Sequence, residues 1–141
     1  MLRVGDDLLV HADATFYPKY GRTIEEVNTA VAAVLRCDDP GQWDVLLQHM
    51  VGKRAFQGDA GAKFLSRMLD RFGGRRLIHG HSPIARVTDV PPQDVTSAYV
   101  YHNGRCVNVD HGLYFGGPGF IFRARQPEPV LSTHTARRRT A

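Results

Sequence analysis

Two short apolar runs, each ending directly at a histidine, constrain the fold of this chain more than any other feature. The run Leu-Leu-Val at residues 8–10 is followed by His11, and the run Leu-Ile at residues 77–78 is followed by His79. Short apolar runs of this kind are typical of buried strands. Because α/β sheets bind ligands at the carboxyl ends of their strands, we expect an α/β domain with polar side chains at one edge of its sheet.

Three helical patterns lie between these two runs. Residues 23–36 begin with a Thr-x-x-Glu capping box and carry apolar residues at three- and four-residue spacing. A second amphipathic pattern follows a Pro-Gly break at 40–41 and should end at Gly52. A third is expected to follow a polar loop at residues 57–61 and to end at the Gly-Gly pair 73–74.

The second half of the chain has the pattern of antiparallel β-structure. Two β-prone runs, at residues 98–101 and 105–109, flank the tripeptide His-Asn-Gly, and Asn-Gly in this position is a strong hairpin signal. Residues 119–123 are predicted to form a final strand. The order of elements therefore predicts an α/β domain with an antiparallel second half and with helices packed on one side of the sheet.

The chain of 141 residues is long enough for one domain with its own core. We assign residues 1–125 to this domain and residues 126–141 to a disordered basic tail, because three consecutive arginines at 137–139 supply most of the net charge of +4. The remaining body is nearly neutral, so we expect no nucleic-acid partner for it. No apolar run approaches the roughly 20 residues that span a bilayer, and we expect a cytoplasmic protein with no membrane partner and two free cysteines.

The histidines at the strand ends are candidate metal ligands. His11, His79 and His81 each lie where an apolar run stops. Neutral imidazole is a good ligand for zinc, iron or manganese, and side chains from adjacent strand ends can converge on one ion although they are distant in sequence. The alternative is that these histidines form structural hydrogen bonds, and their spacing alone favours that alternative.

Three short motifs accompany the strand ends. Residues 9–13 read Leu-Val-His-Ala-Asp, residues 80–83 read Gly-His-Ser-Pro, and residues 107–112 read Val-Asn-Val-Asp-His-Gly and precede Gly-Gly at 116–117. They resemble, in the same order, the His-Gly-Gly strand end, the Gly-His-Thr-Pro loop and the Asn-Ile-Asp-Thr-Gly turn of calcineurin-like metallophosphoesterases. The resemblance is to the carboxy-terminal part of the branch that contains protein serine/threonine phosphatases and diadenosine tetraphosphatase-like enzymes, and it covers residues 8–122.

The resemblance implies a role for each matching residue. His11 and His81 would bind the same ion of the family's two-metal centre, which holds Mn, Fe or Zn. Asp13, His79 and Ser82 would support that ion's ligands or contact the substrate, and a structural role is the alternative for His79. Three residues would shape the closing turn of the domain: Asn108, Asp110 and Gly112.

The resemblance also implies a fold and a reaction. The fold would be the carboxy-terminal part of a β-sandwich with helices packed outside, and the reaction would be hydrolysis of phosphate esters or anhydrides by a metal-bound hydroxide. The earlier motifs of the family, Asp-x-His, Gly-Asp-x-x-Asp-Arg and Gly-Asn-His-Asp, are absent, and Gly-Asp at 58–59 and Asp-Arg at 70–71 lack their spacing. The chain should therefore hold at most one half-site and be inactive alone.

The sequence leaves three functional hypotheses open. In the first, the chain is the carboxy-terminal piece of a metal-dependent phosphatase that acts on a phosphorylated substrate, either truncated or completed by an amino-terminal half or by a homo-oligomer. In the second, it is a non-catalytic phosphatase-like module that docks a partner through an exposed sheet face or edge. In the third, the arginine tail binds an acidic polymer.

Overall fold

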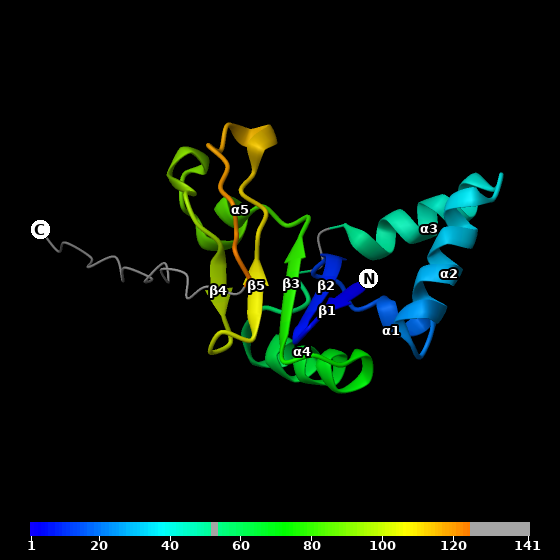
Figure 1. Cartoon of the computed structure of the whole chain (residues 1–141). Coiled ribbons are helices and arrows are strands. Elements are labelled where there is room, and N and C mark those ends of the chain that lie inside the picture. Colours follow the sequence, from blue (N-terminus) through cyan, green and yellow to red (C-terminus); the bar gives the residue numbers. More distant parts are fainter. Residues whose placement is uncertain (52–53, 125–141) are drawn as a thin grey trace, which may run out of the picture.

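A computed structural model describes residues 1–51 and 54–124 and shows a mixed five-stranded sheet with helices (Figure 1). The α/β class is therefore confirmed. Its strands are β1 (Leu2–Val4), β2 (Asp7–Ala12), β3 (Arg76–Gly80), β4 (Tyr99–Tyr101) and β5 (Cys106–Asn108). They lie in the order β1-β2-β3-β5-β4.

The three inner strands are parallel, and only the two outer strands are antiparallel to their neighbours. β2 pairs with β3 in parallel, and β3 pairs with β5 in parallel. The predicted hairpin is confirmed, because β4 pairs with β5 in antiparallel register. The prediction of an antiparallel second half was wrong in one respect, since β5 also joins the parallel centre of the sheet.

The predicted final strand at residues 119–123 was also wrong. This segment forms no strand, and Gly119 has a φ of +80°, which is outside the extended region. Its apolar side chains Phe120 and Phe122 instead pack on the sheet face that carries Ile78 and Val107. The segment thus covers the sheet without joining it. A second sheet is not present in residues 1–51 and 54–124, so the β-sandwich stays a prediction.

Five helices accompany the sheet in the described residues. They are α1 (Tyr17–Tyr20), α2 (Ile24–Arg36), α3 (Pro40–Met50), α4 (Gly58–Phe72) and α5 (Ile84–Thr88), with short 3-10 turns at Pro92–Asp94 and Leu113–Phe115. The first predicted helix is confirmed with its cap, because the Thr23 side chain accepts a hydrogen bond from the Glu26 amide at 3.1 Å. The Glu26 carboxylate bonds to the amide of Arg22 rather than that of Thr23. The second predicted helix is confirmed as α3, and Gly52 lies outside the described residues.

The third predicted helix begins earlier than expected. The polar residues from Gly58 onward form the first turns of α4, not a loop. Gly61 explains the misleading pattern, because a Cβ atom at this position would lie 2.2 Å from the carbonyl carbon of Phe56. Glycine here permits a close approach of two backbones inside a helix, where glycine is otherwise unfavourable.

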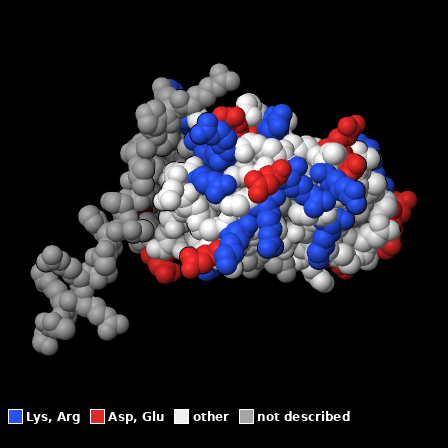
Figure 2. All heavy atoms as spheres, turned by 90° about the horizontal axis from the view of Figure 1, so that it is seen from below, with Lys and Arg blue, Asp and Glu red and all other residues white. Residues whose placement is uncertain are grey.

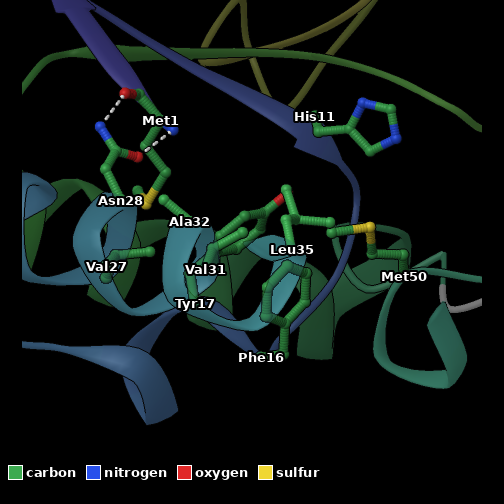
Figure 3. Close-up of a pocket in the computed structure, with 10 residues that line it drawn as sticks. All are labelled: Met1, His11, Phe16, Tyr17, Val27, Asn28, Val31, Ala32, Leu35 and Met50. Atoms are coloured by element: carbon green, nitrogen blue, oxygen red, sulfur yellow. Dashed lines mark hydrogen bonds between the residues drawn. The ribbon is translucent and has the colours of Figure 1, made fainter. Parts of the chain in front are cut away.

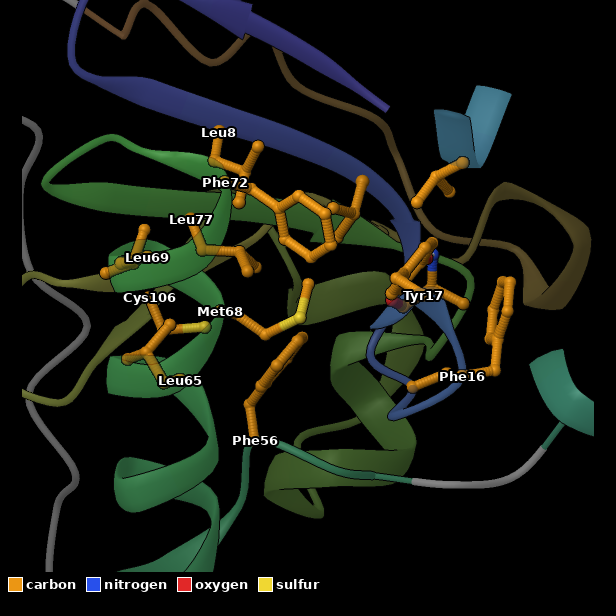
Figure 4. Close-up of a cluster of buried hydrophobic side chains, with 14 of the residues drawn as sticks. Leu8, Phe16, Tyr17, Phe56, Leu65, Met68, Leu69, Phe72, Leu77 and Cys106 are labelled. Carbon is orange, nitrogen blue, oxygen red and sulfur yellow. The ribbon is translucent and has the colours of Figure 1, made fainter. Parts of the chain in front are cut away.

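The main core lies between α4 and one face of the sheet (Figure 4). The buried side of α4 presents Leu65, Met68 and Phe72 to Leu8 of β2 and Leu77 of β3. Full burial of such side chains contributes about 1.5–3 kcal/mol each. This packing fixes α4 against β2 and β3, the two strands whose ends carry the candidate ligands.

The remaining expectations concern membrane helices, the cysteines and the carboxy-terminal tail. The described residues contain no helix long and apolar enough to cross a membrane. Cys37 and Cys106 are both free thiols. The predicted basic tail at residues 126–141 lies outside the described residues. Strand β1 was not expected, because its three exposed residues lack a buried-strand pattern.

Candidate functional site

The parallel pairing of β2 and β3 brings His11 and His81 together. Each residue lies at or just beyond the carboxyl end of its strand, and the two ring centroids are 4.7 Å apart at an interplanar angle of 45°. Both side chains are exposed. His81 has a φ of +65°, a left-handed conformation that few residues other than glycine adopt. Such backbone outliers concentrate at functional sites and persist where the surrounding structure holds them.

The surroundings of His11 favour the neutral form of its imidazole. Partial burial lowers its pKa most, and the nearby His81 lowers it further, while Asp110 acts in the opposite direction. Metal ions bind imidazole only when a ring nitrogen is free of a proton. His11 is therefore in a ligand-competent state at neutral pH.

Hydrogen bonds from the closing turn hold the loop that carries His81. The Asn108 amide donates to the carbonyl oxygen of Ser82 at 2.7 Å, and its side-chain oxygen accepts from the Asp110 amide at 2.9 Å. The Asp110 carboxylate then accepts from the Gly112 amide at 3.0 Å, and its carbonyl oxygen accepts from the Ile84 amide at 2.9 Å. The turn residues singled out in the sequence thus connect β5 to the residues that follow His81 in the loop.

Asp13 is buried and contacts the same loop. Only 1% of its surface is exposed, and one carboxylate oxygen accepts a hydrogen bond from the Ser82 hydroxyl at 3.0 Å. Its other carboxylate oxygen has no hydrogen-bond partner among the described residues. Burial raises the pKa of Asp13, while His79, Ser82 and Arg54 oppose that shift. Asp13 therefore lies behind the exposed histidine pair and supports the loop rather than facing solvent beside it.

His79 has no free ring nitrogen. It is 1% exposed, and its Nδ1 lies 3.1 Å from the carbonyl oxygen of Gly80, which can only accept. Nδ1 therefore carries the proton, and Nε2 accepts from the Tyr101 hydroxyl at 2.7 Å. Burial lowers the pKa of His79, which agrees with a neutral ring. Of the two readings of His79, this geometry agrees with the structural one.

The separation of the two rings is compatible with one half of a metal site. Two imidazoles that bind one ion at about 2.1 Å, with a ligand–metal–ligand angle of about 90–110°, have ring centroids roughly 4.6–5.3 Å apart. The distance of 4.7 Å between His11 and His81 falls in that range. In residues 1–51 and 54–124, no group of three or more His, Cys, Asp or Glu side chains is arranged to hold a metal ion. The pair can therefore supply two ligands but not a closed site.

Sequence reasoning missed two arginines beside the histidine pair. A pocket of about 200 Å³ is lined by Arg54, His81, Ser82 and Arg86, among other residues. The Arg54 guanidinium donates to the carbonyl oxygen of Arg86 at 2.7 Å, and the Arg86 guanidinium lies 4.5 Å from the centre of the Phe115 ring. Guanidinium groups are well suited to bind phosphate oxygens. No signal pointed to these residues, because they lie outside the motifs and far apart in the chain.

A second pocket, also unforeseen, lies on the other side of His11. Figure 3 shows His11 projecting from the end of β2 beside a hollow lined mainly by apolar side chains of α2 and its neighbours. Its volume is about 260 Å³, and Phe16, Val31, Leu35 and Met50 are among the residues that line it. The basic pocket therefore borders His81, and the apolar pocket borders His11.

Comparison of the chain with family models, with curated proteins and with solved structures found no match. The arrangement of residues at the strand ends is therefore the basis on which a function can be argued. That arrangement consists of two exposed neighbouring imidazoles, a hydrogen-bonded loop that holds one of them, and two guanidinium groups in the adjacent pocket.

Proposed function

We propose that this chain supplies half of the metal site of a metal-dependent phosphoesterase, a phosphatase-like hydrolase of phosphate esters or anhydrides. The observation that carries the proposal is the pair formed by His11 and His81, whose rings lie 4.7 Å apart at the ends of adjacent parallel strands. The resemblance to the carboxy-terminal part of calcineurin-like metallophosphoesterases, with its β-sandwich, belongs to the same proposal.

The residues around the pair have distinct roles in this proposal. His11 and His81 hold one divalent ion, Mn, Fe or Zn, and the turn formed by Asn108 and Asp110 keeps the His81 loop in place. Bound metal ions polarise phosphoryl oxygens and activate water for in-line attack. Arg54 lies beside His81, where its guanidinium group can bind the oxygens of a phosphorylated substrate.

The remaining ligands must come from water or from another polypeptide. The described residues offer no third His, Cys, Asp or Glu ligand in reach of the pair. Two histidines with water ligands bind zinc less tightly than three or four protein ligands do. The chain alone should therefore bind one ion weakly and hydrolyse phosphate esters slowly or not at all.

Isothermal titration with zinc and with manganese tests this proposal. We expect one ion per chain, and we expect His81→Ala and His11→Ala each to weaken binding at least tenfold. His102→Asn is the matched control, because it removes an imidazole from the β4–β5 turn, at the opposite ends of the strands. Asparagine tolerates the φ of +51° at that position. Absence of binding, or equal binding by the wild type and His81→Ala, would contradict the half-site.

A non-catalytic docking function is the second candidate. It is favoured by the large apolar side chains that α2 and α3 leave in solvent, since Leu35, Trp43 and Leu47 are each close to half exposed or more. Size-exclusion chromatography with light scattering tests whether this apolar surface mediates association. Concentration-dependent association that Leu47→Lys abolishes would support docking, whereas a monomer at all concentrations would leave the apolar surface without this role.

A further inference from the structure

Basic side chains gather on the face of the molecule opposite the histidine pair. We call this surface the basic face, and it consists of Arg3, Lys63, Arg67, Arg71, Arg75 and Arg105. It lies over α4, β1 and the residues that directly precede β3 and β5, at the amino ends of the parallel strands. Figure 2 shows Lys and Arg side chains across the middle of this view, with acidic side chains mostly at its margin.

A regular stripe on α4 forms the centre of the basic face. Lys63, Arg67 and Arg71 follow one another at four-residue spacing, which places them on one side of the helix about 6 Å apart along its axis. All three side chains are exposed, whereas the opposite side of α4 is buried against the sheet. The stripe is therefore held on a helix that the core fixes in place.

Arginines from other segments widen the stripe into a surface. The Arg105 guanidinium in the β4–β5 turn donates to the Ser66 hydroxyl of α4 at 3.1 Å. The Arg3 guanidinium lies against Gly73, directly after α4. Arg75 and Arg105 line a shared hollow of about 470 Å³ between the turns, together with Asp6 and Asp7. Basic side chains therefore extend from α4 to the residues that precede β3 and β5.

The segments that form the basic face carry more basic than acidic residues. Within the described part of the chain, none of its six residues forms an ion pair with a carboxylate, whereas the adjacent Arg76 pairs with Asp7 at 2.7 Å. Residues 2–7, 58–76 and 102–105 together contain seven basic and four acidic residues, whereas residues 24–50 contain one basic and five acidic residues. The nearly neutral body of the chain thus has a marked separation of charge.

We propose that the basic face binds the phosphate backbone of double-stranded nucleic acid without reading its sequence. Arginine, which supplies five of its six residues, bonds phosphate oxygens in a bidentate geometry. Proteins that prefer single strands stack bases on exposed aromatic side chains. In the part of the chain that the structure describes, the aromatic residues most exposed are Trp43, Tyr114 and Phe115, and none lies on the basic face. A surface of cations without stacking rings suits a duplex backbone.

Fluorescence anisotropy with a labelled 20-base-pair DNA duplex tests the proposal on the full chain. We expect binding that weakens with salt between 50 and 200 mM NaCl. Replacing Lys63, Arg67 and Arg71 together by glutamine should weaken binding at least tenfold at 50 mM salt. The slope of log affinity against log salt is negative, and it should become less negative by about 2.7. This corresponds to about 0.9 for each lost phosphate contact. Glutamine is a good helix former, and circular dichroism checks that α4 persists.

Two further variants separate the basic face from other cations of the chain. Lys19, Arg22 and Arg36 lie outside the basic face, and their joint replacement by glutamine should leave affinity and salt slope unchanged. The same replacement of the three arginines at 137–139 tests the tail. The proposal is overturned if no duplex binding occurs at 50 mM salt, if only the tail variant loses it, or if single-stranded DNA, anionic vesicles or polyglutamate bind more tightly than the duplex.

Discussion

The two edges of the sheet carry polar groups in opposite ways. At the carboxyl ends of β2 and β3, polar groups behind His11 and His81 are buried and hydrogen-bonded, and Asn108 and Asp13 both bond to Ser82 of the His81 loop. At the amino ends, the side chains of the basic face are exposed and unpaired with carboxylates in the described residues. A metal ion requires ligands at fixed positions, whereas a phosphate backbone accepts mobile cations. The two proposals, a metal ion at the carboxyl ends and nucleic acid at the amino ends, rest on this difference.

The largest change in the free energy of unfolding should follow removal of a buried polar side chain at the carboxyl ends of the parallel strands. Asn108→Ala leaves the Ser82 carbonyl and the Asp110 amide without partners, and Asn108 is 0% exposed. We expect the free energy of unfolding to fall by about 2–4 kcal/mol, measured by urea denaturation. A loss below about 0.5 kcal/mol is typical of surface substitutions. Such a small loss would contradict the claim that buried hydrogen bonds hold the carboxyl ends of the strands in place.

The pH dependence of stability offers a second contrast. Burial lowers the folded-state pKa of His79, so the unfolded chain binds the proton more readily below pH 6.5. This contribution to stability is present above pH 6.5 and is lost as the pH falls below that value. Between pH 7.5 and 5.5, wild type should lose up to about 1.4 kcal/mol more than His79→Gln.

Asp13 also contributes to the pH dependence, and both proteins retain it, although His79 influences its pKa. Burial raises its pKa, so its contribution changes with pH in the opposite direction, and the comparison is of the two pH slopes rather than of absolute stabilities. Equal slopes for the wild type and His79→Gln would show that the ring is not buried in its neutral form.

At the amino ends of the parallel strands, loss of the ion pair beside the basic face should have a smaller effect on stability. Arg76 donates to both carboxylate oxygens of Asp7, at 2.7 and 2.9 Å, and both side chains are partly buried. We expect Asp7→Asn to lower the free energy of unfolding by about 1 kcal/mol at low ionic strength. The loss should shrink in 1 M NaCl, and a loss that does not depend on salt would point to packing instead.

The smallest effect should come from the basic face itself. Arg75 is exposed and forms no ion pair in the described residues. Arg75→Gln should change the free energy of unfolding by less than about 0.5 kcal/mol while it weakens duplex binding. A large loss of stability would assign Arg75 to the structure and would remove it from the proposed interface.

The sequence predicted elements whose signals are local. The helix at Ile24–Arg36 has its cap and its periodicity within one segment, and the β4–β5 hairpin has its Asn-Gly turn. The start of α4 was missed because Gly61 meets the distant Phe56 backbone. The segment at residues 119–123 was mistaken for a strand because its apolar residues pack on a sheet face without pairing.

The same distinction between local signals and tertiary contacts applies to the residues of the candidate site. His11 and His81 were found because each follows an apolar run, and their proximity follows from parallel pairing of β2 and β3. Arg54 and the basic face could not be found, because their side chains are assembled from segments that no motif connects. The sequence therefore indicates where strands end, while tertiary contacts decide which charged side chains meet there.

Long-range ¹H–¹⁵N NMR of the imidazole nitrogens during a zinc titration tests the central claim most directly. The account predicts that the ring nitrogens of His11 and His81 shift together and reach their end points at the same zinc concentration. The His79 signals should keep the pattern of a neutral ring with a protonated Nδ1, because both of its nitrogens are already hydrogen-bonded. Zinc-induced shifts at only one of the two exposed histidines, or at neither, would contradict the half-site.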